Sequence, residues 1–287
     1  MKIFRDIIAY TDFYNRVKKK HEKIGFVATM GALHKGHLSL LENAQKETDI
    51  TICSVFVNPA QFNDPNDYLN YPRVLEDDIK LLEQNNCDVL FAPSEREMYP
   101  DNGSDAKKLK LGVMGEVMES KFRPGHFAGV VAIVQRLFNI IKPDRAYFGE
   151  KDFQQLAIIT KMASDLNYPI SIIGCPTIRE DDGLAMSSRN LLLSKKEREN
   201  AAGIYLTLKA GKEKVKYLNV RELKTWIKEK INSYPCLTAQ YVEIVDERTL
   251  ASIRNWPDAD KAICCVAVYA GKTRLIDNRV LFTKQHS

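Results

Sequence analysis

Long hydrophobic runs are missing from this 287-residue sequence, and their absence excludes several classes of protein. No stretch approaches the ~18 consecutive apolar residues of a membrane-spanning helix, so we expect no membrane partner. The first 20 residues contain a short apolar patch, but they also carry Asp6 and Asp12 and no small-residue cleavage site. That pattern argues against a signal peptide. We therefore expect a mature protein of the cytoplasm.

Paired cysteines and the common cofactor motifs are missing as well. The six cysteines show no CxxC spacing, which argues against a zinc or disulfide framework. Most lie in apolar, strand-like runs such as TICSVFV and AICCVAV, as expected for buried thiols in a reducing compartment. The GxxxxGK[ST] phosphate loop and the HExxH zinc motif are absent, as are internal repeats and low-complexity segments.

A strong charge of one sign is also lacking, because the net charge is only +5 and acidic residues are interleaved with the basic ones. One alternative for the chain, a nucleic-acid-binding protein, would show a concentrated basic stripe with interleaved aromatic residues. The dispersed charge is instead typical of a solvated surface, so we expect no nucleic-acid partner. The small basic excess remains compatible with an anionic small-molecule substrate.

The sequence does contain alternating strand and helix patterns. Apolar runs predict strands at 23–29, 50–58 and 88–93, separated by helices around 38–44 and 75–86. After a loop-rich stretch at 94–126, the pattern resumes with a helix at 127–141, a strand at 145–149, a helix at 152–166 with Asp152 as its N-cap, and a strand at 170–174. We therefore predict an α/β domain over residues 1–175, a Rossmann-like doubly wound parallel sheet.

The sequence after about residue 190 has a different pattern of helices and strands. Two charged helices are expected at 195–215 and 220–231, then three strands at 239–246, 262–270 and 273–282. Strands that follow one another in this way favour antiparallel pairing. We predict a smaller C-terminal α+β domain over residues 176–287, which begins with the loop that carries MSSRN.

The first candidate site is the stretch ATMGALHKGHLSLLENA, at the turn after the strand 23–29. In a doubly wound sheet this turn lies at the carboxyl edge, where ligands bind near a helix N-terminus. Gly31 and Gly36 allow close backbone approach, and imidazoles at His34 and His37 could donate hydrogen bonds to phosphate oxygens. On this stretch alone, a pair of surface histidines or half of a metal site remains open. No third ligand occurs at matching spacing, however.

Two further polar clusters follow predicted strands. At 142–156, Lys151 stands beside a helix N-terminus, where a purely structural residue would more often be Ser, Thr or Glu, so phosphate contact is the better explanation. At 179–194, the group Ser187, Ser188, Arg189 and Asn190 is either a helix-capping loop or a polyphosphate clamp. Three such clusters together favour a nucleotide site.

Four segments closely resemble the pantothenate synthetase (pantoate–beta-alanine ligase) family: TMGALHKGHLSL, SVFVNPAQFNDPNDYLNYPR, FRPGHFAGVVAIVQRLFNIIKPDRAYFGEKDFQQL and IREDDGLAMSSRN. The resemblance covers about residues 24–194 and continues more weakly to RLIDN at 274–278. HxGH by itself would indicate only the wider superfamily of nucleotidyltransferases and class I aminoacyl-tRNA synthetases, in which MSSRN occupies the place of the KMSKS loop.

The resemblance implies a two-step ligase. ATP and pantoate would give pantoyl adenylate and pyrophosphate, and the amine of beta-alanine would then displace AMP to give pantothenate. Its catalytic residues would be His34, His37, Lys151 and Arg189. The residues implied to bind ATP are Met30, Gly31, Ala32, Leu33, His34, Lys35, Gly36, His37, Gly149, Glu150, Lys151, Asp152, Ile178, Met186, Ser187, Ser188 and Arg189.

The resemblance also implies sites for the other substrates, a metal and a second subunit. Gln61, Gln155 and Asn58 would bind pantoate and beta-alanine, and Asp77 with Asp78 would lie at a magnesium site. A homodimer is implied, with which an edge position for the strand at 50–58 would be compatible. Arg123 and His126 would either add positive charge or serve the structure. A rival within the superfamily, an adenylyltransferase acting on a phosphorylated acceptor, would need basic residues where the two uncharged glutamines stand.

Overall fold

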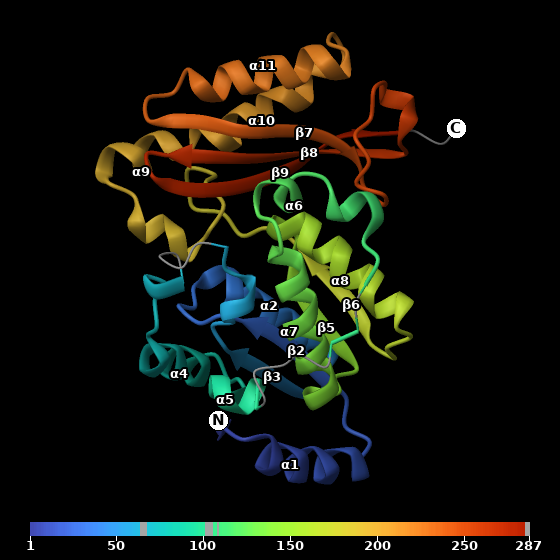
Figure 1. The fold of residues 1–287 in the computed structure, drawn as a ribbon. Coiled ribbons are helices and arrows are strands. Elements are labelled where there is room, and N and C mark those ends of the chain that lie inside the picture. The colour runs from blue at the N-terminus through green and yellow to red at the C-terminus, as the bar shows by residue number, and fades with distance from the viewer. Residues whose placement is uncertain (64–67, 101–105, 108, 285–287) are drawn as a thin grey trace. The chain divides into compact units, whose positions relative to one another are not determined.

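A parallel sheet forms the centre of the N-terminal part of the chain (Figure 1). The computed structural model describes residues 1–63, 68–100, 106–107 and 109–284. The strands run in the order β1-β4-β3-β2-β5-β6, and every neighbouring pair is parallel. Their bounds are β1 (Lys2–Phe4), β2 (Ile24–Thr29), β3 (Ile50–Val55), β4 (Val89–Phe91), β5 (Arg145–Gly149) and β6 (Ser171–Cys175). The predicted doubly wound sheet is confirmed.

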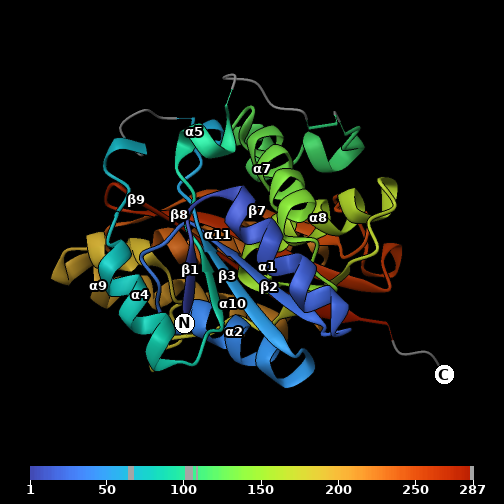
Figure 2. The ribbon, with the colours of Figure 1, turned by 90° about the horizontal axis from the view of Figure 1, so that it is seen from below.

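Helices cover both faces of this sheet (Figure 2). On one side lie α1 (Ile7–Lys19), α7 (His126–Ile141) and α8 (Phe153–Asp165), and on the other α2 (Lys35–Glu47) and α4 (Leu75–Gln84). Because side chains alternate along a strand, Phe26 faces α7, where its ring lies 6.4 Å from that of Phe138. The next residue, Val27, packs on the opposite side in a cluster with Leu41 of α2 and Leu82 of α4. These two apolar layers hold the strand ends in place.

Two elements at the N-terminus were not predicted. The strand β1 has only three residues, too few to show an alternating pattern, and it adds to the edge of the sheet beside β4. The helix α1 begins after Asp6, whose Oδ1 accepts a hydrogen bond from the Ala9 amide at 2.7 Å. Asp6, an acidic residue that argued against a signal peptide, is therefore a helix cap.

The strand at 50–58 differs from expectation in two ways. It ends at Val55, and it pairs on both sides, with β2 and with β4. The expectation that it lies near an edge is wrong, because β1 supplies that edge. The loop-rich stretch 94–126 includes residues 101–105 and 108, which lie outside the described residues. Its described parts contain three short helices, α5 (Glu95–Met98), η2 (Gly112–Gly115) and α6 (Glu119–Phe122).

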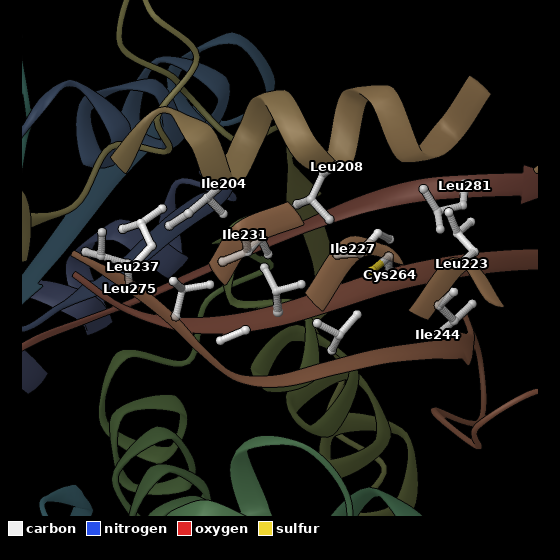
Figure 3. Close-up of a cluster of buried hydrophobic side chains, with 14 of the residues drawn as sticks. Ile204, Leu208, Leu223, Ile227, Ile231, Leu237, Ile244, Cys264, Leu275 and Leu281 are labelled. Atoms are coloured by element: carbon white, nitrogen blue, oxygen red, sulfur yellow. The ribbon is translucent and has the colours of Figure 1, made fainter. Parts of the chain in front are cut away.

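The C-terminal part is built on the antiparallel sheet β7-β8-β9, as predicted. Its strands are β7 (Leu237–Asp246), β8 (Lys261–Ala270) and β9 (Thr273–Thr283), and α10 (Gly203–Lys214) and α11 (Val220–Asn232) pack on it. Figure 3 shows this core, in which Leu208, Leu223 and Ile227 of the helices meet side chains such as Ile244 and Cys264 of the strands.

One predicted helix is divided. The expected helix at 195–215 consists of α9 (Lys195–Ala201) and α10, separated at Ala202. At the start of α10, the position where a Cβ of Gly203 would stand lies 2.7 Å from the ring of Tyr234. Only glycine admits the ring there, and glycine is a weak helix former. Gly203 directly follows the division, and its close contact is with Tyr234, 31 positions further along the chain.

By internal contacts the chain forms two compact units. The first contains residues 1–110, 123–150 and 155–176, and the second contains residues 111–122, 151–154 and 177–287. Among the described residues, no single helix is long and apolar enough to cross a membrane, and two consecutive helical segments, 112–122 and 126–141, meet the criteria only when counted together. Five of the six cysteines are buried free thiols, and Cys236 is exposed. Burial raises the pKa of Cys87 and of Cys175 to about 11, so both are protonated at neutral pH.

Candidate active site

The first two candidate segments follow neighbouring strands at the switch point of the sheet. The strands β2 and β5 pair directly, and the chain order reverses between them. The chain leaves β2 into residues 30–37 and leaves β5 into residues 149–152. Ligands bind at such a switch point in open α/β sheets. At Gly149, a Cβ would meet nothing within 4 Å, which leaves space for a ligand beside the backbone.

The loop after β2 is held by a buried carboxylate from α4. The amide of Ala32 donates to Oδ2 of Asp78 at 3.0 Å, and that of Leu33 donates to Oδ1 at 2.7 Å. Gly31 and Ala32 both have positive φ angles, +81° and +50°. A Cβ on Gly31 would stand 2.8 Å from Oδ2 of Asp78, so this position requires glycine. Burial raises the pKa of Asp78, and the two amide hydrogen bonds oppose that rise.

His34 and His37 cap the beginning of α2 for each other. Nδ1 of His34 accepts from the Gly36 amide at 3.1 Å, and Nδ1 of His37 accepts from the His34 amide at 3.3 Å. Their ring centroids lie 4.1 Å apart. An imidazole whose Nδ1 accepts a hydrogen bond carries its proton on Nε2 when neutral. The two rings therefore present Nε2–H donors at a helix N-terminus. Lys35 begins α2 and is exposed.

Met30, Gln61 and Asn58 form one hydrogen-bonded group within the first unit. Nε2 of Gln61 lies 2.7 Å from Sδ of Met30, and Oε1 of Gln61 accepts from Nδ2 of Asn58 at 3.4 Å. Asn58 is 1% exposed, donates to the Gly129 carbonyl at 3.2 Å, and accepts from the Tyr99 hydroxyl at 2.8 Å. The group fixes the Gln61 amide against the loop after β2.

His126 contacts the backbone of Gln61, and Arg123 contacts His126. Nδ1 of His126 lies 2.8 Å from the Gln61 carbonyl, which can only accept, so Nδ1 carries the proton. Nε2 then accepts from the Arg123 guanidinium at 3.1 Å. His126 is buried and neutral in this arrangement, and it supports the backbone of Gln61. Of the two roles expected for this residue, the geometry favours the structural one.

Lys151 belongs to the second unit, in the short helix η3 (Glu150–Asp152) that begins in the first. Its Nζ donates to the Met186 carbonyl at 3.3 Å and lies 4.0 Å from the Asp152 carboxylate. The side chain is 19% exposed, so its charge is partly withdrawn from water. The main-chain carbonyl of Lys151 accepts from Nδ2 of Asn278 at 3.0 Å. Asp152 directly precedes α8, as predicted, within η3.

The MSSRN loop follows a tight hairpin. Arg179 and Ala185 form an antiparallel bridge, and the Met186 amide donates to the Ile178 carbonyl at 3.0 Å. Oγ of Ser187 then accepts from the Arg189 amide at 3.3 Å, where Ser187 caps the helix η4 (Ser188–Leu192). The capping interpretation of this cluster therefore holds for Ser187. The side chains of Ser188 and Arg189 are half-buried.

The remaining predicted residues fall into two groups. The Gln155 side chain, half-buried on α8, makes no hydrogen bond within the described part of the chain, which leaves its amide available to a ligand.

Asp77 is exposed and pairs with Lys80 at 3.3 Å, whereas both oxygens of its neighbour Asp78 are engaged by backbone amides. Among the described residues, no group of three or more His, Cys, Asp or Glu side chains could hold a metal ion. The two aspartates therefore do not fit a metal site made by protein ligands alone.

Sequence reasoning missed several residues that organise these loops. Tyr99 fixes Asn58, and Asn278 contacts the carbonyl of Lys151. In the second unit, Arg179 forms a bidentate ion pair with Asp277, at 2.7 and 2.9 Å. A second buried pair joins Arg274 to Glu119 of α6. The only signal for three of them was the segment RLIDN, which carries Arg274, Asp277 and Asn278.

Comparison with known proteins places these features in context. The family model for pantoate-beta-alanine ligase matches residues 2–280. A pantothenate synthetase from Porphyromonas gingivalis is 45% identical over 278 residues, which cover 97% of this chain and 98% of that protein. The corresponding protein from Bacteroides thetaiotaomicron is 46% identical, with the same coverage.

Two solved structures are similar over nearly the whole chain. A pantothenate synthetase from Thermus thermophilus has a TM-score of 0.91 and 40% identity, and the match covers 98% of this chain and 100% of that one. A pantoate-beta-alanine ligase from Francisella tularensis, complexed with beta-gamma ATP and beta-alanine, has a TM-score of 0.82 and 39% identity, with 99% of each chain covered.

Proposed function

This chain belongs to the pantoate-beta-alanine ligase family, and from that premise we propose how its residues serve the reaction. The chain is an ATP-dependent ligase of pantothenate biosynthesis, which condenses pantoate with beta-alanine. In the first step the pantoate carboxylate attacks the α-phosphorus of ATP, and the bond to the β-phosphate oxygen breaks to release pyrophosphate. In the second step the beta-alanine amine attacks the acyl carbon, loses a proton, and displaces AMP.

In the first unit we assign ATP binding to residues 30–37 and to Gly149 and Glu150. The observation that carries this assignment is the pair of imidazoles whose Nδ1 atoms accept backbone amides at the switch point. Nε2–H groups held in this way can donate to phosphate oxygens without a change of protonation state. Adenylyl transfer mainly needs positioning and stabilisation of charge on phosphorus, which fixed donors supply.

In the second unit we assign contacts with ATP to Lys151 and Asp152, to Ile178, and to residues 186–189. Lys151 and Arg189 would supply positive charge for phosphate oxygens, and Arg can do so with two parallel hydrogen bonds. Because the Ile178 carbonyl already accepts from Met186, its remaining lone pair is the group that the backbone can offer to adenine.

Pantoate and beta-alanine are assigned to Gln61 and Gln155, and Asn58, which is buried and fully hydrogen-bonded, is assigned the role of orienting Gln61. The Gln61 amide is oriented by Asn58 and Met30, and that of Gln155 has no partner among the described residues. Uncharged amides suit the hydroxyl groups of pantoate better than the phosphate of a phosphorylated acceptor. This choice separates the proposal from a different adenylyltransferase of the same superfamily.

Mg²⁺ is proposed to accompany ATP, where it would neutralise phosphate charge. Magnesium usually keeps several waters and binds through one or two carboxylates together with substrate phosphates. Both oxygens of Asp78 already accept hydrogen bonds from backbone amides, which argues against further metal ligands from the protein. A homodimer, by analogy with the family, and a cytoplasmic location, in keeping with buried free thiols, complete the proposal.

The proposed reaction is tested by the exchange of labelled pyrophosphate into ATP. We expect exchange in the presence of ATP, Mg²⁺ and pantoate without beta-alanine, because only the adenylate step is reversible in that mixture. AMP should accumulate only when ATP, Mg²⁺, pantoate and beta-alanine are all present. Exchange that fails with pantoate but proceeds with another acid would show that the substrate is wrong.

A further inference from the structure

Lys151 is fixed at both of its ends by groups of the second unit. Its ammonium group contacts the Met186 carbonyl at 3.3 Å, and its own carbonyl accepts from Nδ2 of Asn278 at 3.0 Å. A lysine side chain loses much rotamer freedom when it is ordered. A lysine that is already ordered in the free protein does not lose that freedom again when it meets a ligand.

Both contacts of Lys151 depend on consecutive residues of β9, Asp277 and Asn278. Asn278 reaches the lysine backbone directly. Asp277, 4% exposed, holds Arg179 by two hydrogen bonds of 2.7 and 2.9 Å, and it also accepts from the Asn278 amide at 2.8 Å. Arg179 in turn donates to the Gly183 carbonyl at 3.0 Å, inside the hairpin that ends at Met186.

The hairpin is therefore attached to the same strand as the lysine turn. The guanidinium of Arg179 lies over the Tyr205 ring at 4.6 Å, and that ring packs against Gly183 so closely that a Cβ there would stand 2.1 Å away. Since Met186 donates its amide to Ile178, the carbonyl that receives the lysine ammonium belongs to a rigid turn.

We propose that Asn278 is a positioning residue for Lys151 in adenylate formation, and that the Arg179–Asp277 ion pair positions the Met186 carbonyl for the same purpose. This inference rests on the proposed role of Lys151 in binding ATP phosphates. Asn278 acts through the lysine backbone and touches no reactant. Its effect should therefore vanish when the lysine side chain is removed.

A double-mutant cycle tests this dependence. The variants Asn278→Ala, Lys151→Ala and the double substitution are compared in pantoate-dependent pyrophosphate exchange. We expect Asn278→Ala alone to lower the kcat of exchange about tenfold, as for the loss of one hydrogen bond, with the KM for pantoate unchanged. In the Lys151→Ala background the same substitution should change kcat less than about twofold, because residues that act as a unit are not additive.

Two further variants distinguish positioning from general damage. Asn278→Asp has nearly the same shape but cannot donate to the Lys151 carbonyl, so its loss of kcat should be at least that of Asn278→Ala. Asn232→Ala is the matched control, because Asn232 also makes a hydrogen bond to the backbone within the second unit, at 2.8 Å to Ala239, away from Lys151. We expect it to retain the kcat of the parent protein. Thermal unfolding of each variant verifies that it is folded.

The possible failures are separable. If Asn278→Ala lowers kcat by the same factor in both backgrounds, or if Asn278→Asp is fully active, Asn278 does not act through Lys151 and the inference is wrong. If Lys151→Ala itself exchanges pyrophosphate at the parental rate, the proposed role of the lysine fails, and the inference fails with it.

Discussion

A histidine ring can serve phosphate chemistry as a cation, as an acid or as a neutral donor, and the hydrogen bond at Nδ1 discriminates among these. In His34 and His37, Nδ1 accepts from a backbone amide, so protonation of that atom would break the cap of α2. The neutral ring with its proton on Nε2 keeps the helix cap at Nδ1 and still offers a hydrogen-bond donor to phosphate. In the proposed site, positive charge for the triphosphate would then come from Lys151 and Arg189.

Replacement of His37 separates these roles. We expect His37→Ala to lower the rate of pyrophosphate exchange by about 10²-fold or more, because one fixed donor to the phosphates is lost. His37→Gln keeps an acceptor at the position that a capping box uses, but it lacks the ring. It should therefore restore thermal stability without restoring exchange. Recovery of exchange in His37→Gln would show that only the cap matters.

Gln61→Ala provides the contrast at the same scale. An uncharged amide that orients pantoate should affect mainly the KM for pantoate, by about tenfold for one lost hydrogen bond. Steady-state kinetics with varied pantoate measures this.

If preformed pantoyl adenylate and beta-alanine react slowly on the His37 variant while adenylate formation is normal, the histidine serves the amine step and its assignment to ATP fails.

At the scale of elements, the site depends on the first turn of α4, which holds the loop that precedes α2. Asp78, in the first turn of α4, accepts the amides of Ala32 and Leu33 ahead of α2. The loop backbone there has two consecutive residues with positive φ, of which Ala32 is not glycine. Such a conformation costs energy and persists only where its surroundings enforce it. The carboxylate of Asp78 supplies that constraint.

Removal of this carboxylate should therefore cost both stability and activity. Asp78→Ala leaves two amides without acceptors, so we expect the free energy of unfolding to fall by about 2–4 kcal/mol and the KM for ATP to rise. Urea denaturation measures the first effect and exchange kinetics the second. Asp77→Ala is the matched control for stability. Its exposed pair with Lys80 predicts a change within about 0.5 kcal/mol. Equal losses in both variants would contradict the role of Asp78.

At the scale of the whole molecule, the two compact units have separate cores, one on each sheet. The edges of the parallel sheet are β1 and β6, so the interior strand β3 offers no edge to a second subunit. The expected homodimer therefore rests on the family alone, and it requires a surface other than β3.

The oligomeric state can be measured directly. We expect static light scattering at micromolar concentration to give twice the 32.7 kDa mass of the chain. A dilution series acts as the control, because a genuine dimer dissociates with a concentration dependence set by its affinity. A mass near that of one chain throughout the series would exclude the dimer.

The sequence alone determined the order of strands and helices and the positions of the candidate loops. Periodicity is a local property, so β2 and β5 can be recognised from their 6 and 5 residues and α7 from its 16. The same holds for the two histidines, which lie three residues apart at one helix start. Several elements were missed: β1, which has three residues, the 13-residue helix α1, and the division between α9 and α10.

Only the tertiary structure decided which residues hold those loops in place. Asp78 meets the Leu33 amide across 45 positions of the chain, Arg179 meets Asp277 across 98, and Asn278 meets the Lys151 carbonyl across 127. A single hydrogen bond between distant residues leaves no periodic trace in the sequence, because neither partner constrains its own neighbours. Such contacts exist only once the strands have paired and brought their ends together.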